Sequence, residues 1–451
     1  MNINVPDYAQ KALDLLHAAG FEAYVVGGCV RDSLLDKTPN DWDITTNALP
    51  DDTKKVFSDF KVIETGIKHG TVAVIIDYNV IEITTYRVDG EYRDNRHPEK
   101  VTFTRNLKED LARRDFTINA LAFSGDGELV DEFSGVTDLE GKCIRCVGEP
   151  DERFNEDALR IMRALRFSST LNFDIDEKTS LGIHKNKELL KNIAAERKTE
   201  ELLKLLCGYG PRVTKILIEY RDVFAILIPE IKPCFDFDQK NCHHIYDVYE
   251  HIAYSVGAAD PLPDVRLALL LHDIGKPQVF KVDFDGVGHT YNHADVSFEL
   301  SKSILSRFRL PTDFVETVLT LVRFHDYPVT PEKKIVRRRL SKFGPELLKK
   351  LMLVKIGDNA AHNLQTGDYY PEIIEVLDMI ESIVEEGNAG DNCFSLKGLD
   401  IKGDDIVKLG YRGPKVGKIL DKLLLEVIEE NLENEHTKLI ERAKEIGTGK
   451  A

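Results

Sequence analysis

The chain has 451 residues, and its 60 Lys and Arg against 77 Asp and Glu give it a net charge of −17. Hydrophobic residues make up 42% and charged residues 30%, which excludes a disordered chain and supplies enough apolar side chain for several domains. Seven cysteines, no long apolar run and no basic-then-apolar N-terminus exclude a disulfide scaffold, a membrane span and an export signal, so we expect a cytoplasmic protein.

The N-terminal third is predicted to mix helices and strands. The spacing of apolar residues predicts an amphipathic helix over residues 7–20, and the apolar run Ala23–Val26 predicts a short strand. Residues 71–76 and 80–86 have a period near two and predict adjacent strands. After about residue 150 helical periodicity dominates. We therefore expect an α+β fold whose strands are concentrated in the first third.

A glycine pair after the first predicted strand suggests a phosphate site. Gly27 and Gly28 lie between that strand and a predicted helix, and glycine lets backbone N–H groups approach a triphosphate without an intervening Cβ. Arg31 follows one turn later, and its guanidinium can bind phosphate through two parallel hydrogen bonds. A glycine pair alone is usually an ordinary turn, so this interpretation depends on the residues that follow.

Two aspartates come next, in an extended segment. Asp41 and Asp43 are two residues apart, so their side chains project from the same face. Two carboxylates this close are costly unless a divalent cation lies between them. A two-metal site would activate a 3′-hydroxyl and neutralise the leaving pyrophosphate. Glu82 is a candidate third carboxylate, and the combination predicts nucleotidyl transfer.

Residues 111–121 carry polar side chains between apolar ones that can bury the segment. Arg114 can bind phosphate, and Asp115 and Asn119 can bind ribose hydroxyls. The alternative is a buried ion pair that braces a helix.

Residues 155–167 predict a helix on which Asp157, Arg160, Arg163 and Arg166 form one polar stripe, because residues three apart are neighbours on a helix. A carboxylate accepts from the exocyclic amine of cytosine or adenine, while a guanidinium donates to their ring acceptors. Guanine and uracil present the opposite pattern, so an Asp–Arg pair would select C and A without a template. The alternative is an ordinary surface salt bridge.

Histidines cluster later in the chain, where eight of the 13 fall between residues 243 and 362. The apolar run 267–271 ends in adjacent His272 and Asp273. Imidazole and carboxylate together suit a divalent metal with open positions for water and phosphate, and metal-bound water would attack a phosphoester. The other candidate metal ligands of this region are His251, His293, His325 and Asp358.

The motifs of the first half occur in an order that resembles the bacterial class II tRNA nucleotidyltransferases, the CCA-adding enzymes, with poly(A) polymerases as close relatives. The matching residues are Gly27-Gly28 with Arg31-Asp32, Asp41 and Asp43, Arg113 to Ala120, Glu156-Asp157 with Arg160, and Glu196-Arg197. The resemblance implies four parts: a polymerase-β-like nucleotidyltransferase head (1–145), a helical neck that binds nucleotide and RNA (146–235), an HD-type domain (236–375) and a helical tail that binds tRNA (376–451).

The same resemblance implies roles for individual residues. It implies catalysis and Mg²⁺ binding at Asp41 and Asp43, and base reading at Asp157 and Arg160. The implied nucleotide contacts are Gly28, Arg31 and Arg114, with Arg163 and Arg166 on the triphosphate and Asp115 and Asn119 on the ribose.

The histidine region resembles the HD phosphohydrolase superfamily. This resemblance implies His251, His272, Asp273 and Asp358 as core ligands of a divalent metal of the Mg²⁺, Mn²⁺ or Ni²⁺ type, with His293 and His325 as candidates for a second metal. It implies phosphatase or 2′,3′-cyclic phosphodiesterase activity. The alternative is an HD fold that only binds RNA. We interpret His243 and His244 as packing or surface residues.

Together these resemblances imply template-independent addition of C, C and A to the 3′ end of tRNA from CTP and ATP, with the enzyme gripping the acceptor and T arm. A polar loop at residues 86–98 favours full CCA addition, although an enzyme that adds only the terminal A keeps this loop too. Poly(A) polymerase is a second alternative, which the acidic balance disfavours. A different class would be a metal phosphohydrolase with a nucleotide-binding head. The oligomeric state is left open.

Two basic segments interrupt the acidic average, one at residues 333–350 and one at residues 412–422. Either could contact phosphates or form a solvated helix face.

Overall fold

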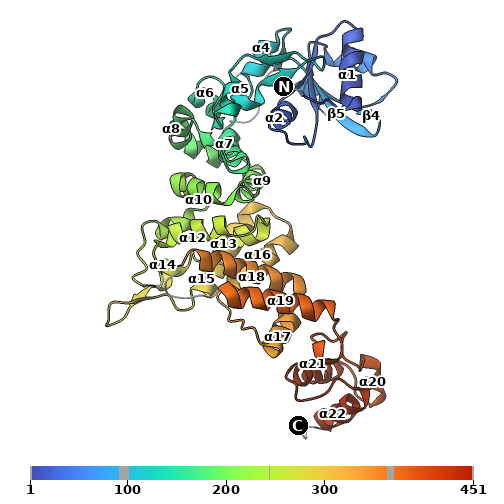
Figure 1. Ribbon diagram of the computed structural model, residues 1–451, viewed down its shortest axis with the longest axis vertical. Helices are drawn as coiled ribbons and strands as arrows, with labels where there is room; N and C mark the ends of the chain where they lie inside the picture. Colours follow the sequence, from blue (N-terminus) through green and yellow to red (C-terminus); the bar gives the residue numbers. More distant parts are fainter. Residues whose placement is uncertain (1–2, 65, 91–100, 243, 363–369, 449–451) are drawn as a thin grey trace. The chain divides into compact units, whose positions relative to one another are not determined.

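The computed structural model describes residues 3–64, 66–90, 101–242, 244–362 and 370–448 (Figure 1). The chain forms two compact units, Met1–Arg212 with Glu219–Pro229, and Val213–Ile218 with Glu230–Ala451. Within the described ranges, no helix has the length and apolarity needed to cross a membrane. The first unit contains the predicted head and most of the predicted neck, and the second contains the predicted HD region and tail. The finer boundaries between the four parts stay a prediction.

A seven-stranded mixed sheet is the centre of the first unit, with strand order β3-β4-β5-β2-β1-β8-β9. All neighbouring strands are antiparallel except the parallel pair β2 and β5. The strands are β1 (Ala23–Val26), β2 (Asp43–Thr46), β3 (Lys61–Ile63), β4 (Thr71–Ile76), β5 (Asn79–Thr85), β8 (Leu121–Phe123) and β9 (Leu129–Asp131). The predicted strand at Ala23–Val26 is confirmed, as is the predicted pairing of the strands at 71–76 and 80–86.

Short helices connect the strands of this sheet. The first helix buries Ala12, Leu13 and Leu16 on one face, which is why its apolar residues recur at helical spacing. It ends before Gly20, whose positive φ of 85° ends the helical path. The helices of this part are α1 (Asp7–Ala18), α2 (Gly28–Leu34), α3 (Pro50–Val56), α4 (Leu107–Ala112) and α5 (Gly135–Glu140).

The predicted polar loop after β5 is only partly a loop. Its first residues form β6 (Arg87–Asp89), which pairs antiparallel with β7 (Val101–Phe103). Residues 91–100 lie outside the described residues, so the prediction of full CCA addition from this loop stays a prediction.

The predicted helix over residues 155–167 is interrupted. The chain forms α6 (Pro150–Glu156) and α7 (Leu159–Leu171), with Asp157 between them in an extended conformation (φ −133°, ψ 102°). The Asp157 carboxylate accepts a hydrogen bond from the backbone N–H of Leu159 at 3.0 Å, a local bond that competes with the continuous helix. The expected stripe therefore begins at Arg160, and Asp157 is not part of it.

The rest of the first unit is helical, as expected, apart from the two-residue strands β10 (Cys143–Ile144) and β11 (Asp174–Ile175). Its helices are α8 (Glu177–Asn186), α9 (Ala195–Leu206) and α11 (Arg221–Leu227), and α7 packs against α9. The helix α10 (Gly210–Glu219) contains residues of both units.

In the described residues of the second unit, the regular structure is helical apart from the small hairpin of β12 (Lys281–Val282) and β13 (Gly288–His289). Its core is built from mutual packing of α12, α13, α16 and α18, and α15 packs on α16. The helices are α12 (Val248–Ala258), α13 (Pro263–Leu271), α14 (Lys276–Val279), α15 (His293–Phe308), α16 (Thr312–Phe324), α17 (Lys333–Phe343), α18 (Pro345–Ala360), α19 (Tyr370–Glu385), α20 (Gly403–Lys408), α21 (Pro414–Ile428) and α22 (His436–Thr448).

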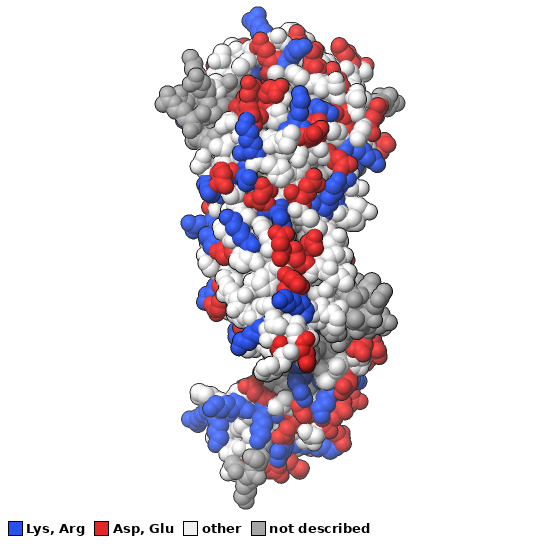
Figure 2. Space-filling view, turned by 90° about the vertical axis from the view of Figure 1, so that its left-hand side faces the viewer, with Lys and Arg blue, Asp and Glu red and all other residues white. Residues whose placement is uncertain are grey.

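The two basic segments have different surroundings. In the first, Arg337 is buried and donates to the carbonyl oxygens of Asp391 and Ile428, and Arg338 pairs with Glu429. In the second, Lys418 is exposed on α21. Figure 2 shows acidic and basic side chains interspersed over most of one face, with a group of Lys and Arg in the C-terminal part at the bottom of the view. Arg337 and Arg338 thus connect α17 to the C-terminal part of the chain. Fewer basic side chains of this segment are therefore left to bind phosphates.

Candidate functional site

The glycine turn after β1 has a conformational and a steric reason. Gly27 has a φ of +83°, which side-chain-bearing residues rarely adopt, and its carbonyl accepts the Arg31 N–H at the start of α2. A Cβ on Gly27 would lie 3.2 Å from Nη1 of Arg114 and 3.8 Å from the carbonyl oxygen of Asn119. The turn thus holds the chain close to the guanidinium of Arg114.

Three carboxylates lie beside this turn. Asp43 on β2 and Glu82 on β5 are Cα partners in the parallel strand pair, so their side chains project from the same face. Asp41, Asp43 and Glu82 are all exposed to solvent. We call these three residues the head site. This strand register places Glu82, the candidate third carboxylate, on the same face as Asp43.

The head site concentrates negative charge. Although Asp43 reaches solvent, desolvation by surrounding protein atoms, followed by the charges of Asp41 and Glu82, raises the pKa of Asp43 to about 6, and Arg114 opposes this shift. A bound divalent cation would relieve the repulsion and favour the ionised carboxylates. Side-chain oxygens of this kind are the ligands that Mg²⁺ and Mn²⁺ prefer. The donor set therefore fits a divalent-metal centre of nucleotidyl transfer.

Arg31 is fixed by neighbouring side chains. Its guanidinium donates to both carboxylate oxygens of Asp32, at 2.8 and 2.9 Å, and to Oδ1 of Asn119 at 2.7 Å. Arg114 forms a looser ion pair with Asp110 at 3.4 Å, and its buried Nε has no hydrogen-bond partner among the described residues. Of these two predicted phosphate contacts, Arg114 keeps more of its donors uncommitted.

Asp115, which is buried, and Arg163, whose side chain is a third exposed, form an ion pair like the one considered as the alternative to ribose binding. Nε of Arg163 donates to Oδ2 of Asp115 at 2.8 Å, and Nδ2 of Asn119 donates to Oδ1 at 3.1 Å. Burial alone would raise the pKa of Asp115, but the charges of Arg163 and Arg160 and the Asn119 hydrogen bond hold it well below the ordinary value. The pair ties α7 to the 3₁₀ turn that carries Asn119.

Three of the predicted nucleotide-binding arginines lie close to the aromatic ring of Phe167. The guanidiniums of Arg31, Arg163 and Arg166 lie 5.0, 5.3 and 3.9 Å from the ring centroid of Phe167. Cation–π contacts of this kind fix a cationic side chain without consuming its N–H donors. Arg166 additionally donates to Oε2 of Glu201 at 2.5 Å. Arg163 and Arg166, the two arginines predicted to contact the triphosphate, therefore both pack against Phe167.

Asp157 and Arg160 are not paired with each other. Oδ2 of Asp157 lies 3.0 Å from Nη2 of Arg197, and Nη1 of Arg160 donates to Glu156 at 2.6 Å. Nη2 of Arg160 donates to the carbonyl oxygen of Arg113 at 2.8 Å. The ordinary surface salt bridge between them, the alternative considered from the sequence, is therefore absent among the contacts of the described residues.

A second centre lies in the helical core of the second unit. Nε2 of His251 lies 2.9 Å from Oδ1 of Asp358 and 3.3 Å from Oδ2 of Asp273. Nε2 of His272 lies 3.3 Å from the same Asp273 oxygen. The other oxygen of Asp273 faces His293 and His325, at 3.3 and 3.8 Å. We call these six residues the HD centre, and α12, α13, α15, α16 and α18 bring them together.

All four imidazoles of the HD centre are oriented in the same way. Nδ1 of His272, His293 and His325 lies 2.7, 2.9 and 2.7 Å from the backbone carbonyl oxygens of Leu269, Thr290 and Val322. Nδ1 of His251 lies 3.4 Å from that of Ala361. An Nδ1–H that donates to a carbonyl leaves the Nε2 lone pair for a metal.

Two further observations fit divalent metals. Nε2 of His272 is buried without a hydrogen-bond partner among the described residues. Nε2 of His293 and Nε2 of His325 face each other at 3.0 Å, where two lone pairs repel unless a proton or a metal ion lies between them. Burial lowers the pKa of His325 to about 3, which keeps the ring neutral. The residues present therefore fit two metal positions that share Asp273.

Several neighbours of these sites were missed from the sequence. Asp110 and Glu201 are buried acids that form ion pairs with arginines of these sites. Asp110 lies three and four residues before Arg113 and Arg114, a helical spacing that could have been found in the sequence. Glu201 is distant in the chain from its partner Arg166 and has no such signal. His244, interpreted as packing or surface, packs against His251 and His362, and His243, which had the same interpretation, lies outside the described residues. No local pattern marks these histidines, because three distant segments meet there.

Family models match three parts of the chain. Residues 23–145 match the Poly A polymerase head domain, residues 172–235 match the probable RNA and SrmB-binding site of polymerase A, and residues 243–361 match the HD domain.

Whole proteins of known family are also similar. The CCA-adding enzyme of Streptococcus suis is 32% identical to this chain over 98% of both sequences. The CCA-adding enzyme of Limosilactobacillus reuteri is 34% identical over 97% of this chain and 96% of its own length. The CCA-adding enzyme of Lactobacillus helveticus is 53% identical over 46% of this chain, and this chain spans about half of that relative, 52% of its length. The structure of the Bacillus stearothermophilus CCA-adding enzyme in complex with CTP is similar, with a TM-score of 0.72 at 29% identity over 98% of both chains. The Thermotoga maritima CCA-adding enzyme complexed with tRNA shares the fold, with a TM-score of 0.59 at 21% identity over 99% of this chain and 97% of that one.

Proposed function

The chain belongs to the CCA-adding enzyme family, and on this premise we propose that it adds C, C and A to the 3′ end of tRNA, using CTP and ATP without a nucleic-acid template. The observation that carries the proposal is the register of β2 and β5, which places Glu82 beside Asp43 and, with Asp41, collects three solvent-facing carboxylates next to the Gly27 turn. Nucleotidyl transfer needs such a carboxylate set within reach of a triphosphate site.

Each part of the reaction has residues to serve it. Bound Mg²⁺ at Asp41, Asp43 and Glu82 would lower the barrier to attack by the 3′-hydroxyl and stabilise the leaving pyrophosphate. The backbone at Gly28 and the guanidinium of Arg114 would hold the phosphates. Further positive charge near the phosphates would come from the three arginines that pack against Phe167, which are Arg31, Arg163 and Arg166.

Base selection is proposed for Asp157 and Arg160. Their partners, Arg197 and Glu156, orient the two side chains separately rather than neutralising them as a pair. The Asp157 carboxylate would accept from the exocyclic amine of C or A, and Arg160 would donate to the ring acceptors. When the base binds, Asp157 would exchange its hydrogen bond with Arg197, and Arg160 its hydrogen bond with Glu156, for hydrogen bonds to the base.

The proposed RNA partner is the acceptor and T arm of tRNA. The match of residues 172–235 to an RNA-binding model and the exposed Lys418 on α21 support contacts in the neck and in the tail. CTP, ATP and tRNA precursors would be met in the cytoplasm, which is where we place the enzyme.

The test uses tRNA transcripts that end before the CCA, after C and after CC. Each is incubated with the protein and CTP, ATP, both, GTP or UTP, and the products are resolved to single nucleotides. We expect all three to be extended to CCA and no further. Addition of one A to the CC end alone would indicate an A-adding enzyme, and a long A ladder would indicate a poly(A) polymerase.

A second activity is proposed for the HD centre, which would hydrolyse phosphomonoesters or 2′,3′-cyclic phosphates. The specific observation is the 3.0 Å approach of the Nε2 atoms of His293 and His325, beside an Asp273 shared with His251 and His272. Bound divalent metal of the Mn²⁺, Ni²⁺ or Mg²⁺ type would supply a nucleophilic water there. Hydrolysis of 2′,3′-cyclic CMP and of tRNA ending in a cyclic phosphate tests this activity, and an HD centre that only supports RNA binding would hydrolyse neither.

A further inference from the structure

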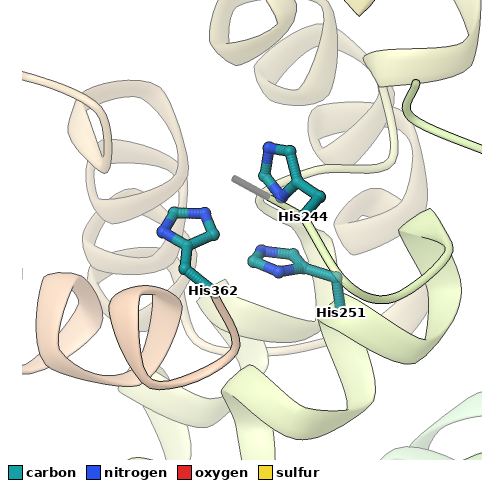
Figure 3. Close-up of side chains that lie close together, drawn as sticks. All are labelled: His244, His251 and His362. Atoms are coloured by element: carbon teal, nitrogen blue, oxygen red, sulfur yellow. The ribbon is translucent and has the colours of Figure 1, made fainter. Parts of the chain in front are cut away.

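Three histidines from separate segments lie together at the edge of the HD centre (Figure 3). His244 precedes α12, His251 lies within α12, and His362 follows α18. The ring centroids of His244 and His362 are 4.8 Å apart, and those of His251 lie 5.4 and 5.1 Å from them. His251 is one of the six residues of the HD centre, whereas His244 and His362 are not among them.

In this cluster, one ring nitrogen of His244 and one of His362 have no hydrogen bond to the protein among the described residues. Nδ1 of His244 is buried and has no hydrogen-bond partner among the described residues. Nε2 of His362 lies 3.8 Å from Oδ1 of Asp358, which is too long for a hydrogen bond. One nitrogen from each of His244, His251 and His362 can be chosen so that all three lie within 4.8 Å of one another. Donor atoms at this spacing can reach one ion.

The chemistry of the cluster favours a cation over an anion. Neutral imidazoles present lone pairs, and the neighbouring Asp358 carboxylate adds negative charge. A phosphate held there would face that carboxylate, whereas a metal ion would be attracted to it. A carboxylate has two oxygens, so Asp358 can also contribute to the adjacent HD centre.

We propose that His244 and His362, with Asp358 shared from the HD centre, bind an additional divalent transition-metal ion beside His251 and the two positions of that centre. Because imidazole suits Co²⁺, Ni²⁺ and Zn²⁺ while Mg²⁺ prefers oxygen ligands, the added position discriminates between these ions. The inference rests on the proposed metal binding of the HD centre, but not on its hydrolytic activity.

The experiment counts Co²⁺ ions bound by the full-length protein. The wild-type protein, the His244→Gln/His362→Gln variant and the His272→Gln/Asp273→Asn variant are dialysed to equilibrium against Co²⁺, and the bound metal is measured by mass spectrometry. We expect the His244→Gln/His362→Gln variant to lose one equivalent per chain. In Mg²⁺ dialysis, the wild type and this variant should bind equal amounts. The head site is unchanged in all three proteins, so its contribution cancels.

The outcomes separate the two proposals. If His272→Gln/Asp273→Asn binds as much Co²⁺ as the wild type, the proposed metal binding of the HD centre is wrong. If that variant loses Co²⁺ but His244→Gln/His362→Gln does not, only the additional site is wrong. Anomalous diffraction from Co²⁺-soaked wild-type crystals decides the matter without a variant. A peak about 2.1 Å from Nδ1 of His244 and from a ring nitrogen of His362 supports the site, and no peak there overturns it.

Discussion

Asp43 of β2 stands directly opposite Glu82 of β5 in the one parallel strand pair of the sheet. Because facing residues of paired strands share a face, Glu82 should act with Asp41 and Asp43 in holding metal. We expect Asp43→Asn to lower tRNA extension by more than ~100-fold and Glu82→Gln to lower it by ~10- to 100-fold, the range seen when metal-site partners are removed. Single-turnover extension of a CC-ending tRNA measures both.

A matched control is available in the same hairpin. Asp77→Asn removes an exposed carboxylate in the β4–β5 turn, where Asn tolerates the positive φ of 48°. This variant should extend tRNA like the wild type. Full activity of Glu82→Gln would contradict the three-carboxylate interpretation and leave Asp41 and Asp43 as the acidic pair.

Nucleotide selection should depend on Asp157 and Arg160. Exchanging both for Ala should reduce discrimination against GTP and UTP by about 1–3 kcal/mol, roughly 5- to 150-fold, because each lost base-edge contact carries that much selectivity. The ratio of incorporation rates from mixed nucleotides is the readout, since a ratio does not depend on the fraction of folded enzyme. Unchanged selectivity would refute the base-edge proposal.

The two centres should be separable by mutation. We expect His272→Ala/Asp273→Ala to abolish hydrolysis of 2′,3′-cyclic CMP while CCA addition persists, because these residues supply ligands in the second unit only. Asp41→Ala/Asp43→Ala should do the reverse. His289→Ala, which changes an exposed His–Asp pair on β13, is the matched control and should retain both activities. Persistent hydrolysis in the first variant would place the phosphodiesterase elsewhere.

The Asp115–Arg163 ion pair should make the first unit acid-sensitive. The pKa of Asp115 is held well below its ordinary value by Arg163, so the pair stabilises the fold fully above about pH 4, and this stability is lost as pH falls toward the folded-state pKa. Asp115→Asn should flatten that acid dependence and cost about 1.5–3 kcal/mol at neutral pH, since the charged hydrogen bonds between Asp115 and the partly exposed Arg163 are lost.

Trp42 provides the readout for this prediction. It is the one tryptophan of the chain, only 5% exposed, and it lies between Asp41 and Asp43 in the first unit. Its fluorescence during urea unfolding therefore reports on that unit alone. An equal acid slope in the wild type and in Asp115→Asn would mean that other carboxylates dominate.

Much of the local structure could be predicted from the sequence, because it depends on neighbours along the chain. The strand at Ala23–Val26 and the helix at 7–20 follow from apolar periodicity, which reflects one buried face. The helix predicted over 155–167 was wrong at Asp157, where a side-chain bond to Leu159 N–H replaces the helical path. A competing local bond of this kind is not visible in a count of apolar spacings.

The sequence by itself determined the residue types and their spacing: Asp41 and Asp43 on one face, a glycine turn before a helix, and adjacent His272 and Asp273. Only the tertiary structure decided which distant residues join them. Strand pairing placed Glu82 opposite Asp43, and helix packing brought His293 to His325 and His244 to His362. The physical reason is that spacing depends on local backbone geometry, whereas these meetings depend on burial of apolar faces far apart in the chain.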